Sequence, residues 1–181
     1  MLGTIKRGDR DAAPAAAPDF WLRTPTRDDG PAVTALVEEC PPLDRNSRYC
    51  NLLQCTDFAD TCVLAETDSQ PIGWVSAYRP PFDDLSLFVW QVAVHPDARG
   101  LGLGKTMILD ILRRPVCSEI ESLRTTVTPD NHASRAMFES LARDLKAPLT
   151  EESHFDSKRH FERRHDSENL ITIGNFTIAA V

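Results

Sequence analysis

The chain has 181 residues, of which 41% are hydrophobic, and a formal net charge of -7 at pH 7. This length and hydrophobic content fit a single domain with a sizeable core. The acidic balance argues against broad binding of nucleic acid or of anionic membranes, because both attract basic proteins. No apolar run approaches the roughly 18 residues of a membrane span. A small cationic substrate is compatible with this charge.

Residues 1–19 are rich in alanine and proline, which predicts a disordered leader ahead of one folded domain over residues 20–181. Capping residues, proline stops and apolar periodicity predict helices over residues 31–39, 48–56, 106–113 and 133–145. Alternating and β-branched runs predict strands over residues 20–23, 62–66, 71–77, 87–94, 123–127 and 170–178. This order favours an α/β (α+β) fold with a mixed, mostly antiparallel sheet flanked by helices.

The cysteines indicate a reducing compartment. They are odd in number, match no zinc-ligand spacing and mostly have apolar neighbours, so we expect buried thiols in a cytoplasmic protein. The N-terminus also lacks the apolar core of a signal peptide. We expect no metal site, because the spacings of His154, His160 and His165 do not match helical ligand pairs. The cysteines are Cys40, Cys50, Cys55, Cys62 and Cys117.

A glycine-rich segment, R-G-L-G-L-G-K at residues 99–105, lies between a predicted strand and a predicted helix. Glycines let backbone N–H groups approach a phosphate, and the helix N-terminus adds positive charge that Arg99 and Lys105 reinforce. The P-loop pattern fails because its first glycine would fall at Arg99, and the dinucleotide pattern fails because the glycines are spaced by two. The pattern that fits is R-x-x-G-x-G, through Arg99, Gly102 and Gly104. A glycine-rich turn without a ligand is the alternative.

This pattern, within this order of strands and helices, resembles the pyrophosphate loop of the GNAT family of N-acetyltransferases. The resemblance implies a GNAT fold and acetyl-CoA as cosubstrate. It also implies that the strand before the glycines separates from its neighbour at a bulge and offers backbone groups to pantetheine. The residues so assigned to the cofactor are Val92, Val94, Arg99, Gly100, Leu101, Gly102, Leu103, Gly104, Lys105 and Asn131.

Segments 42–49, 88–94, 125–131 and 165–168 resemble the diaminobutyrate acetyltransferase family of ectoine biosynthesis, and the similarity spans about residues 20–176. The D-x-N-S-x-Y and H-D-x-E segments are the specific parts. The resemblance implies acetylation of the 4-amino group of L-2,4-diaminobutyrate by a homodimer without a metal. The residues that it places at the diamine are Asp44, Ser47, Tyr49, Trp90, His165 and Glu168.

The chemistry of that reaction agrees with these residue types. The diamine has a net charge of about +1 at neutral pH, which Asp44 and Glu168 can balance, while Trp90 offers a flat apolar wall. Its ammonium must lose a proton before it attacks the thioester, and three acceptors remain open: His165, Tyr49 or a chain of waters ending at Glu168. We expect direct attack in a ternary complex, with the oxyanion met by a backbone N–H near Val92.

Simpler roles for the same residues remain open. Asp44 and Ser47 can serve only as helix caps, Tyr49 and Trp90 as core aromatics, and Glu168 as a solvated charge. Two other functions also remain: a GNAT acetyltransferase for another small diamine or amino acid, and a non-catalytic acyl-CoA binding module.

Overall fold

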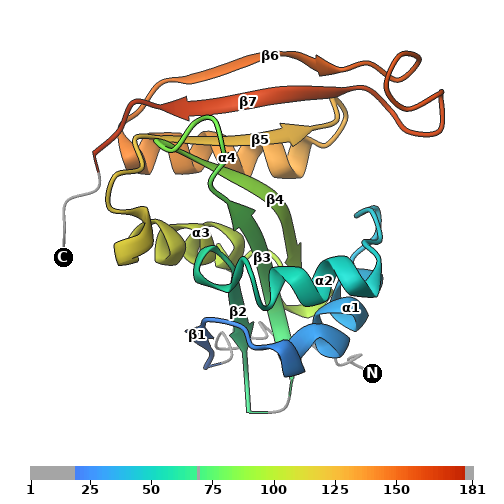
Figure 1. Ribbon diagram of the computed structural model, residues 1–181, viewed down its shortest axis with the longest axis vertical. Helices are drawn as coiled ribbons and strands as arrows, with labels where there is room; N and C mark the ends of the chain where they lie inside the picture. The colour runs from blue at the N-terminus through green and yellow to red at the C-terminus, as the bar shows by residue number, and fades with distance from the viewer. Residues whose placement is uncertain (1–18, 69, 178–181) are drawn as a thin grey trace, which may run out of the picture.

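The computed structural model describes residues 19–68 and 70–177, which form a seven-stranded sheet flanked by helices (Figure 1). The strand order is β1-β2-β3-β4-β5-β7-β6. The strands are β1 (Trp21–Arg23), β2 (Val63–Glu66), β3 (Pro71–Tyr78), β4 (Ser86–Val94), β5 (Ser122–Val127), β6 (Leu149–Phe155) and β7 (Glu168–Gly174). The α-helices are α1 (Gly30–Glu38), α2 (Arg48–Gln54), α3 (Leu103–Leu112) and α4 (His132–Leu145). Short 3-10 turns lie at Arg27–Asp29, Ala59–Thr61, Pro96–Ala98 and Pro115–Cys117.

The predicted fold class is confirmed. Among the described strands, β4 and β5 pair in parallel and the other neighbours pair antiparallel. Most element ends lie within two residues of the predicted bounds. The predicted leader, apart from Asp19, lies outside the described residues, as does Ile178 at the end of the last predicted strand. No helix within the described ranges is long and apolar enough to cross a membrane.

The predicted start of α3 is wrong, because the helix begins at Leu103 and not at residue 106. Gly102 is the N-cap residue of this helix, with a φ of 74°, and Gly100 has a φ of 79°. These left-handed conformations suit glycine, which has no Cβ to clash. Gly104 lies inside the first turn for a different reason, because a Cβ there would come within 2.8 Å of the Met137 sulfur.

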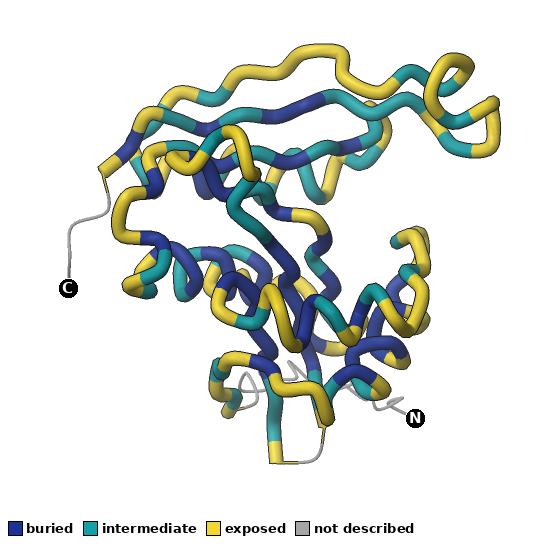
Figure 2. The backbone as a smooth tube through the Cα atoms, in the orientation of Figure 1, coloured by how far each residue is buried: buried dark blue, intermediate teal, exposed yellow. Residues whose placement is uncertain are grey.

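The sequence analysis also missed β6 and extended the last strand too far. Figure 2 shows β6 as an exposed edge strand, and each of its residues after Leu149 is exposed. Its sequence therefore lacks the apolar alternation that predicts a strand. β7 ends at Gly174, where its partners also end, since Gly174 pairs with Ser122 and Ile173 pairs with Leu149.

Two hydrophobic cores lie on opposite faces of the sheet because successive strand residues point to opposite sides. In β3, Val75 and Ala77 belong to the larger core with α3 and α4, whereas Trp74 belongs to the smaller core with α1. Both cores hold β4 in place, since Leu87 and Val89 join the first and Ala93 joins the second.

The sheet opens between β4 and β5, where the two strands pair only from Ser86 to Phe88 on one side and Ser122 to Arg124 on the other. The strands beyond this point turn steeply away from each other (Figure 1). Pairing with β3 shifts register in the same region: Gln91 faces Ser76 and Val89 faces Ala77, so Trp90 is the extra residue of a bulge. This separation and bulge agree with the expectation for the strand before the glycines.

A charge network joins β1, β2 and the turn before α1. The Arg23 guanidinium donates to Asp29 at 2.7 and 2.8 Å and to Glu66 at 2.8 and 2.9 Å. The hydrogen bonds from Arg23 lower the pKa of Asp29 to about 2, and they also lower the pKa of Glu66. Because these folded-state pKa values are depressed, the stabilisation is present above about pH 4 and is lost as pH falls toward 2.

We expect Arg23→Gln to lower the free energy of unfolding at pH 7 by roughly 1 kcal/mol, after allowance for solvent screening. The difference from wild type should shrink as the pH falls from about 4 toward 2, because the carboxylates of the unfolded chain take up protons first and those held by Arg23 in the folded protein follow only near pH 2. Urea unfolding at pH 7 and pH 3 measures it. An equal destabilisation at both values would contradict the network's role.

Candidate active site

A cavity of about 1000 Å³ lies where β4 and β5 separate, and both strands line it. Trp90, Gln91 and Val92 line it from β4, while Thr125 to Val127 line it from β5. The turn before α2 and the segment before β7 close it from either side, and these contribute Asp44, His165 and Glu168. Residues 121 positions apart in the chain therefore meet in one space.

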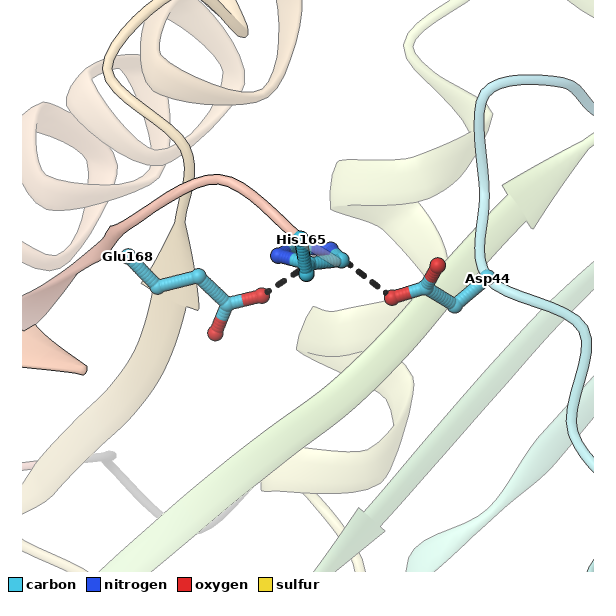
Figure 3. A group of neighbouring side chains, drawn as sticks. All are labelled: Asp44, His165 and Glu168. Atoms are coloured by element: carbon cyan, nitrogen blue, oxygen red, sulfur yellow. Dashed lines mark ion pairs between the residues drawn. The ribbon is translucent and has the colours of Figure 1, made fainter. Parts of the chain in front are cut away.

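Three titratable side chains that line this cavity form a cluster (Figure 3). His165 lies between two carboxylates, with its Nε2 atom 3.0 Å from Asp44 Oδ2 and 3.8 Å from Glu168 Oε1. Glu168 is the first residue of β7, and Asp44 lies on the connection between α1 and α2. The cluster has an excess of negative charge even when the imidazole is protonated, so it is suited to a cation.

The hydrogen bonds of His165 favour its protonated form. Its Nδ1 atom lies 2.7 Å from the carbonyl oxygen of Asp166, while Nε2 faces Asp44. A neutral imidazole has one N–H and satisfies only one of these acceptors. The bond to the Asp166 carbonyl, then the charges of Asp44 and Glu168, raise the pKa of His165 above its ordinary value, against the opposing effect of burial.

The same three residues place one candidate metal-ligand atom each within 4.8 Å of one another. A metal ion requires an imidazole nitrogen without its proton. Both ring nitrogens of His165 face oxygen acceptors here, and the raised pKa of the ring opposes that loss. The arrangement fits an ammonium group better than a metal ion.

Of the remaining residues predicted at the diamine, some line the cavity and others do not. Trp90 lines the cavity at the bulge and is 48% exposed, so it is not a core aromatic. Ser47 caps α2, because its hydroxyl accepts from the Cys50 N–H at 3.1 Å. Tyr49 is 70% exposed and, like Ser47, lies outside the lining of the cavity. The roles of Ser47 and Tyr49 at the substrate therefore stay predictions.

A second cavity, of about 580 Å³, lies beside the first and is formed by the glycine turn. Pro42, Leu43, Val92 and Asn131 are among the residues that line both cavities, so the two spaces are adjacent. Most of the predicted cofactor residues line the second one, whereas Leu101 is exposed and lies outside its lining. Those that line it are Val92, Val94, Arg99, Gly100, Gly102, Leu103, Gly104, Lys105 and Asn131.

The cationic side chains of this turn are held by neighbouring groups. Arg99 Nε donates to the Val94 carbonyl at 3.2 Å. The Lys105 ammonium lies 2.7 Å from Asp144 Oδ2 and donates to Ser140 at 3.1 Å, both on α4. The Lys105 ammonium is therefore already paired, whereas the contact of Arg99 with the Val94 carbonyl uses only its Nε atom.

The β4 backbone is directed as the resemblance implies. The N–H of His95 donates to Ile72 at 2.9 Å, toward β3. Because successive backbone groups of a strand alternate in direction, Val94 and Val92 point to the opposite edge, where β5 has separated. Asn131 lines both cavities, and its side chain caps α4 by accepting from the Ser134 N–H at 3.1 Å.

Several lining residues were not predicted. Phe155, Phe161 and Arg164 line the first cavity from the connection between β6 and β7 and its borders. They follow directly from the missed strand, because a hairpin between residues 149 and 174 brings that connection over the site. Gln91 also lines the cavity, and its position beside Trp90 was the available signal.

Comparison with known proteins places the chain in a family. Residues 30–142 match the Acetyltransferase (GNAT) family. The L-2,4-diaminobutyric acid acetyltransferase of Methylotuvimicrobium alcaliphilum is 46% identical over 89% of this chain and 94% of that protein. The protein of the same name from Bordetella parapertussis is 49% identical over 92% of this chain and 90% of that one.

A solved structure agrees with both. The diaminobutyrate acetyltransferase from Paenibacillus lautus, in complex with its substrate L-2,4-diaminobutyric acid and coenzyme A, has a TM-score of 0.85 and is 33% identical. The match covers 91% of this chain and 99% of that one. The chain is thus a GNAT acetyltransferase that uses acetyl-CoA, and it belongs to the family of L-2,4-diaminobutyric acid acetyltransferases.

Proposed function

We propose that this acetyltransferase transfers the acetyl group of acetyl-CoA to the 4-amino group of L-2,4-diaminobutyrate, giving the 4-N-acetyl product of ectoine biosynthesis. One observation carries the proposal: the cluster of Asp44, His165 and Glu168 lies in a cavity that shares Val92 with the cavity of the glycine turn. A cationic amine in the first space and a thioester extending from the second meet at the free edge of β4.

The transfer is direct, in a ternary complex. The neutral amine attacks the thioester carbonyl and forms the new C–N bond. The C–S bond then breaks, and coenzyme A leaves as the thiol after its thiolate gains the proton that the nitrogen loses. The Val92 N–H, directed to the open edge, donates to the oxyanion in the transition state. A cysteine nucleophile is disfavoured, because burial raises the pKa of all five thiols: to about 11 for Cys55 and Cys117, to about 12 for Cys62, and above the ordinary value for Cys40 and Cys50.

His165 and Glu168 are the acceptors that the geometry favours for the amine proton. Both line the cavity, whereas Tyr49 lies outside its lining. Glu168 is partly buried and the two side chains are 3.8 Å apart, so protonation of one changes the proton affinity of the other. His165 can accept a proton only in its neutral form, which the raised pKa of the ring disfavours.

A coupled assay of coenzyme A release tests the proposed function. With acetyl-CoA present, diaminobutyrate should give turnover well above ornithine and lysine, whose chains are longer. A preference for ornithine would favour an acetyltransferase for another diamine. Tight binding of acetyl-CoA without release on any amine would indicate a non-catalytic acyl-CoA binding module. Proton NMR of the product identifies which nitrogen carries the acetyl group.

The pH dependence should report His165. We expect kcat/KM for the diamine to rise with pH through a pKa above 6.5. Below that value the imidazolium already pairs with Asp44 and Glu168, so it competes with the ammonium and cannot take its proton. In His165→Gln this rise should be absent. A profile that is unchanged in His165→Gln would remove His165 from the mechanism.

We also propose a homodimer in the cytoplasm. All five cysteines are free, which suits a reducing compartment. The exposed edge strand β6 offers unpaired backbone groups to a second copy, as such edges often do. Light scattering coupled to size exclusion measures the mass, and a monomer at micromolar concentration would contradict the dimer.

A further inference from the structure

The buried side chain of Gln91 binds the connection that carries Asp44. We define the Asp44 loop as residues 41–47, between α1 and α2. Gln91 Nε2 donates to the Asp44 carbonyl at 2.8 Å, and Gln91 Oε1 accepts from Asn46 Nδ2 at 3.1 Å. Gln91 is 8% exposed and lies on β4 between Trp90, the residue of the bulge, and Val92. Both ends of the amide are therefore used on one loop.

The Asp44 side chain needs such support, because it has little of its own. It is 73% exposed, and its carboxylate contacts His165 on the side away from Glu168 (Figure 3). The position of this carboxylate thus depends on the loop backbone. The loop backbone is attached to β4 where Gln91 donates to the Asp44 carbonyl. Two side chains add contacts: Asn46 donates to Gln91, and the Cys40 thiol, just before the loop, donates to the Val94 carbonyl at 3.3 Å.

We propose that Gln91 is a positioning residue that sets the distance between the Asp44 carboxylate and the thioester, and so helps to select the length of the diamine. This inference rests on the proposed function. Gln91 is adjacent to Val92, whose N–H we place at the oxyanion, and it holds the loop that receives an ammonium group. One side chain therefore links the two ends of the substrate path, and neither of its hydrogen bonds touches the substrate.

The bulge explains why this residue can do so. In a regular strand, neighbouring residues point to opposite faces. The extra residue Trp90 disturbs this alternation, so that Trp90 and Gln91 both line the cavity on the side of the Asp44 loop. A buried glutamine at this position would be costly without partners, and both of its polar atoms have one.

Gln91→Met tests the proposal, because methionine has about the same length and makes neither hydrogen bond. We expect kcat/KM for diaminobutyrate to fall about tenfold or more, with the Kd for acetyl-CoA within twofold of wild type. The ratio of kcat/KM for diaminobutyrate over ornithine should fall as well. Asn46→Ala, at a partly exposed side chain, should give a smaller loss in the same direction and serves if Gln91→Met folds poorly.

A double-mutant cycle with Asp44→Asn separates positioning from stability. If Gln91 acts through Asp44, Gln91→Met should change kcat/KM by less than twofold once Asp44 is replaced. The pKa of His165, measured by NMR, should fall in Gln91→Met as it does in Asp44→Asn, because Asp44 then moves away while Glu168 and the Asp166 carbonyl remain. This second measurement needs no turnover.

The matched control is Gln54→Met, at a buried glutamine of α2 whose side-chain atoms have no hydrogen-bond partner among the described residues. Gln54→Met should leave kcat/KM for diaminobutyrate within twofold of the wild-type value. The inference is overturned if Gln91→Met and Asn46→Ala both match wild type, or if the loss from Gln91→Met is equally large with Asn at position 44. Wild type that releases no coenzyme A with diaminobutyrate would instead overturn the proposed function, and the NMR comparison would still decide the role of Gln91.

Discussion

Gly104→Asp should raise the Kd for acetyl-CoA by more than a hundredfold. Gly104 lines the second cavity in the first turn of α3, where we place the diphosphate. A carboxylate about 4 Å from an anionic group costs about 4 kcal/mol at an effective dielectric constant near 20. The new Cβ would also lie 2.8 Å from the Met137 sulfur and 3.2 Å from Val92 Cγ1, so these side chains would have to shift.

Titration calorimetry with acetyl-CoA measures this loss, and circular dichroism checks that the fold is kept. Thr106→Asp is the matched control, because it adds the same charge to the same turn at an exposed residue outside the cavity lining. We expect less than a tenfold change there. Affinity of Gly104→Asp within fivefold of wild type would show that the diphosphate binds elsewhere.

Glu168→Gln should lower kcat/KM for diaminobutyrate at least a hundredfold. The carboxylate is partly buried at the start of β7, beside His165. Replacing it leaves the imidazolium and the substrate ammonium with one remaining carboxylate, that of Asp44, which is mostly exposed and so better screened by water. The Kd for acetyl-CoA should stay within twofold, because Glu168 does not line the second cavity.

Steady-state kinetics with both substrates varied measure this change. Glu152→Gln on β6 makes the same substitution at an exposed position outside the cavity lining and should leave kcat/KM unchanged. Asp44→Asn should cost less than Glu168→Gln, because of the greater exposure of Asp44. Equal losses in kcat/KM for Glu152→Gln and Glu168→Gln would show a general effect of charge and not a binding site.

The glycine turn could be predicted from sequence because its function is local. Positive φ values at Gly100 and Gly102 and the helix that follows are properties of a few consecutive residues. The start of α3 could not be predicted, since glycine has low helix propensity and the demand for Gly104 comes from Met137, 33 positions away. The strand β6 was missed because a solvated edge has no apolar alternation.

The cluster around His165 was assembled by the fold and not by spacing. Asp44 and His165 are far apart in the chain, and their contact depends on the connection after β6. Family resemblance supplied these residues, and the structure brings together Asp44, Trp90, His165 and Glu168. Ser47 caps α2, and its role at the substrate stays a prediction. The position of Gln91 beside Trp90 was a sequence signal, but its contacts with the Asp44 loop could not be predicted, because they depend on the fold.

The gap between β4 and β5 trades thermal stability for catalytic activity. Each backbone group turned toward a substrate there is one that the sheet does not use to hold itself together. Selection for heat resistance alone would favour variants in which β4 and β5 form backbone hydrogen bonds over more residues. Such variants should have a higher melting temperature and a lower turnover. Ligands that bind in the gap should restore part of the stability that this missing strand pairing would have provided.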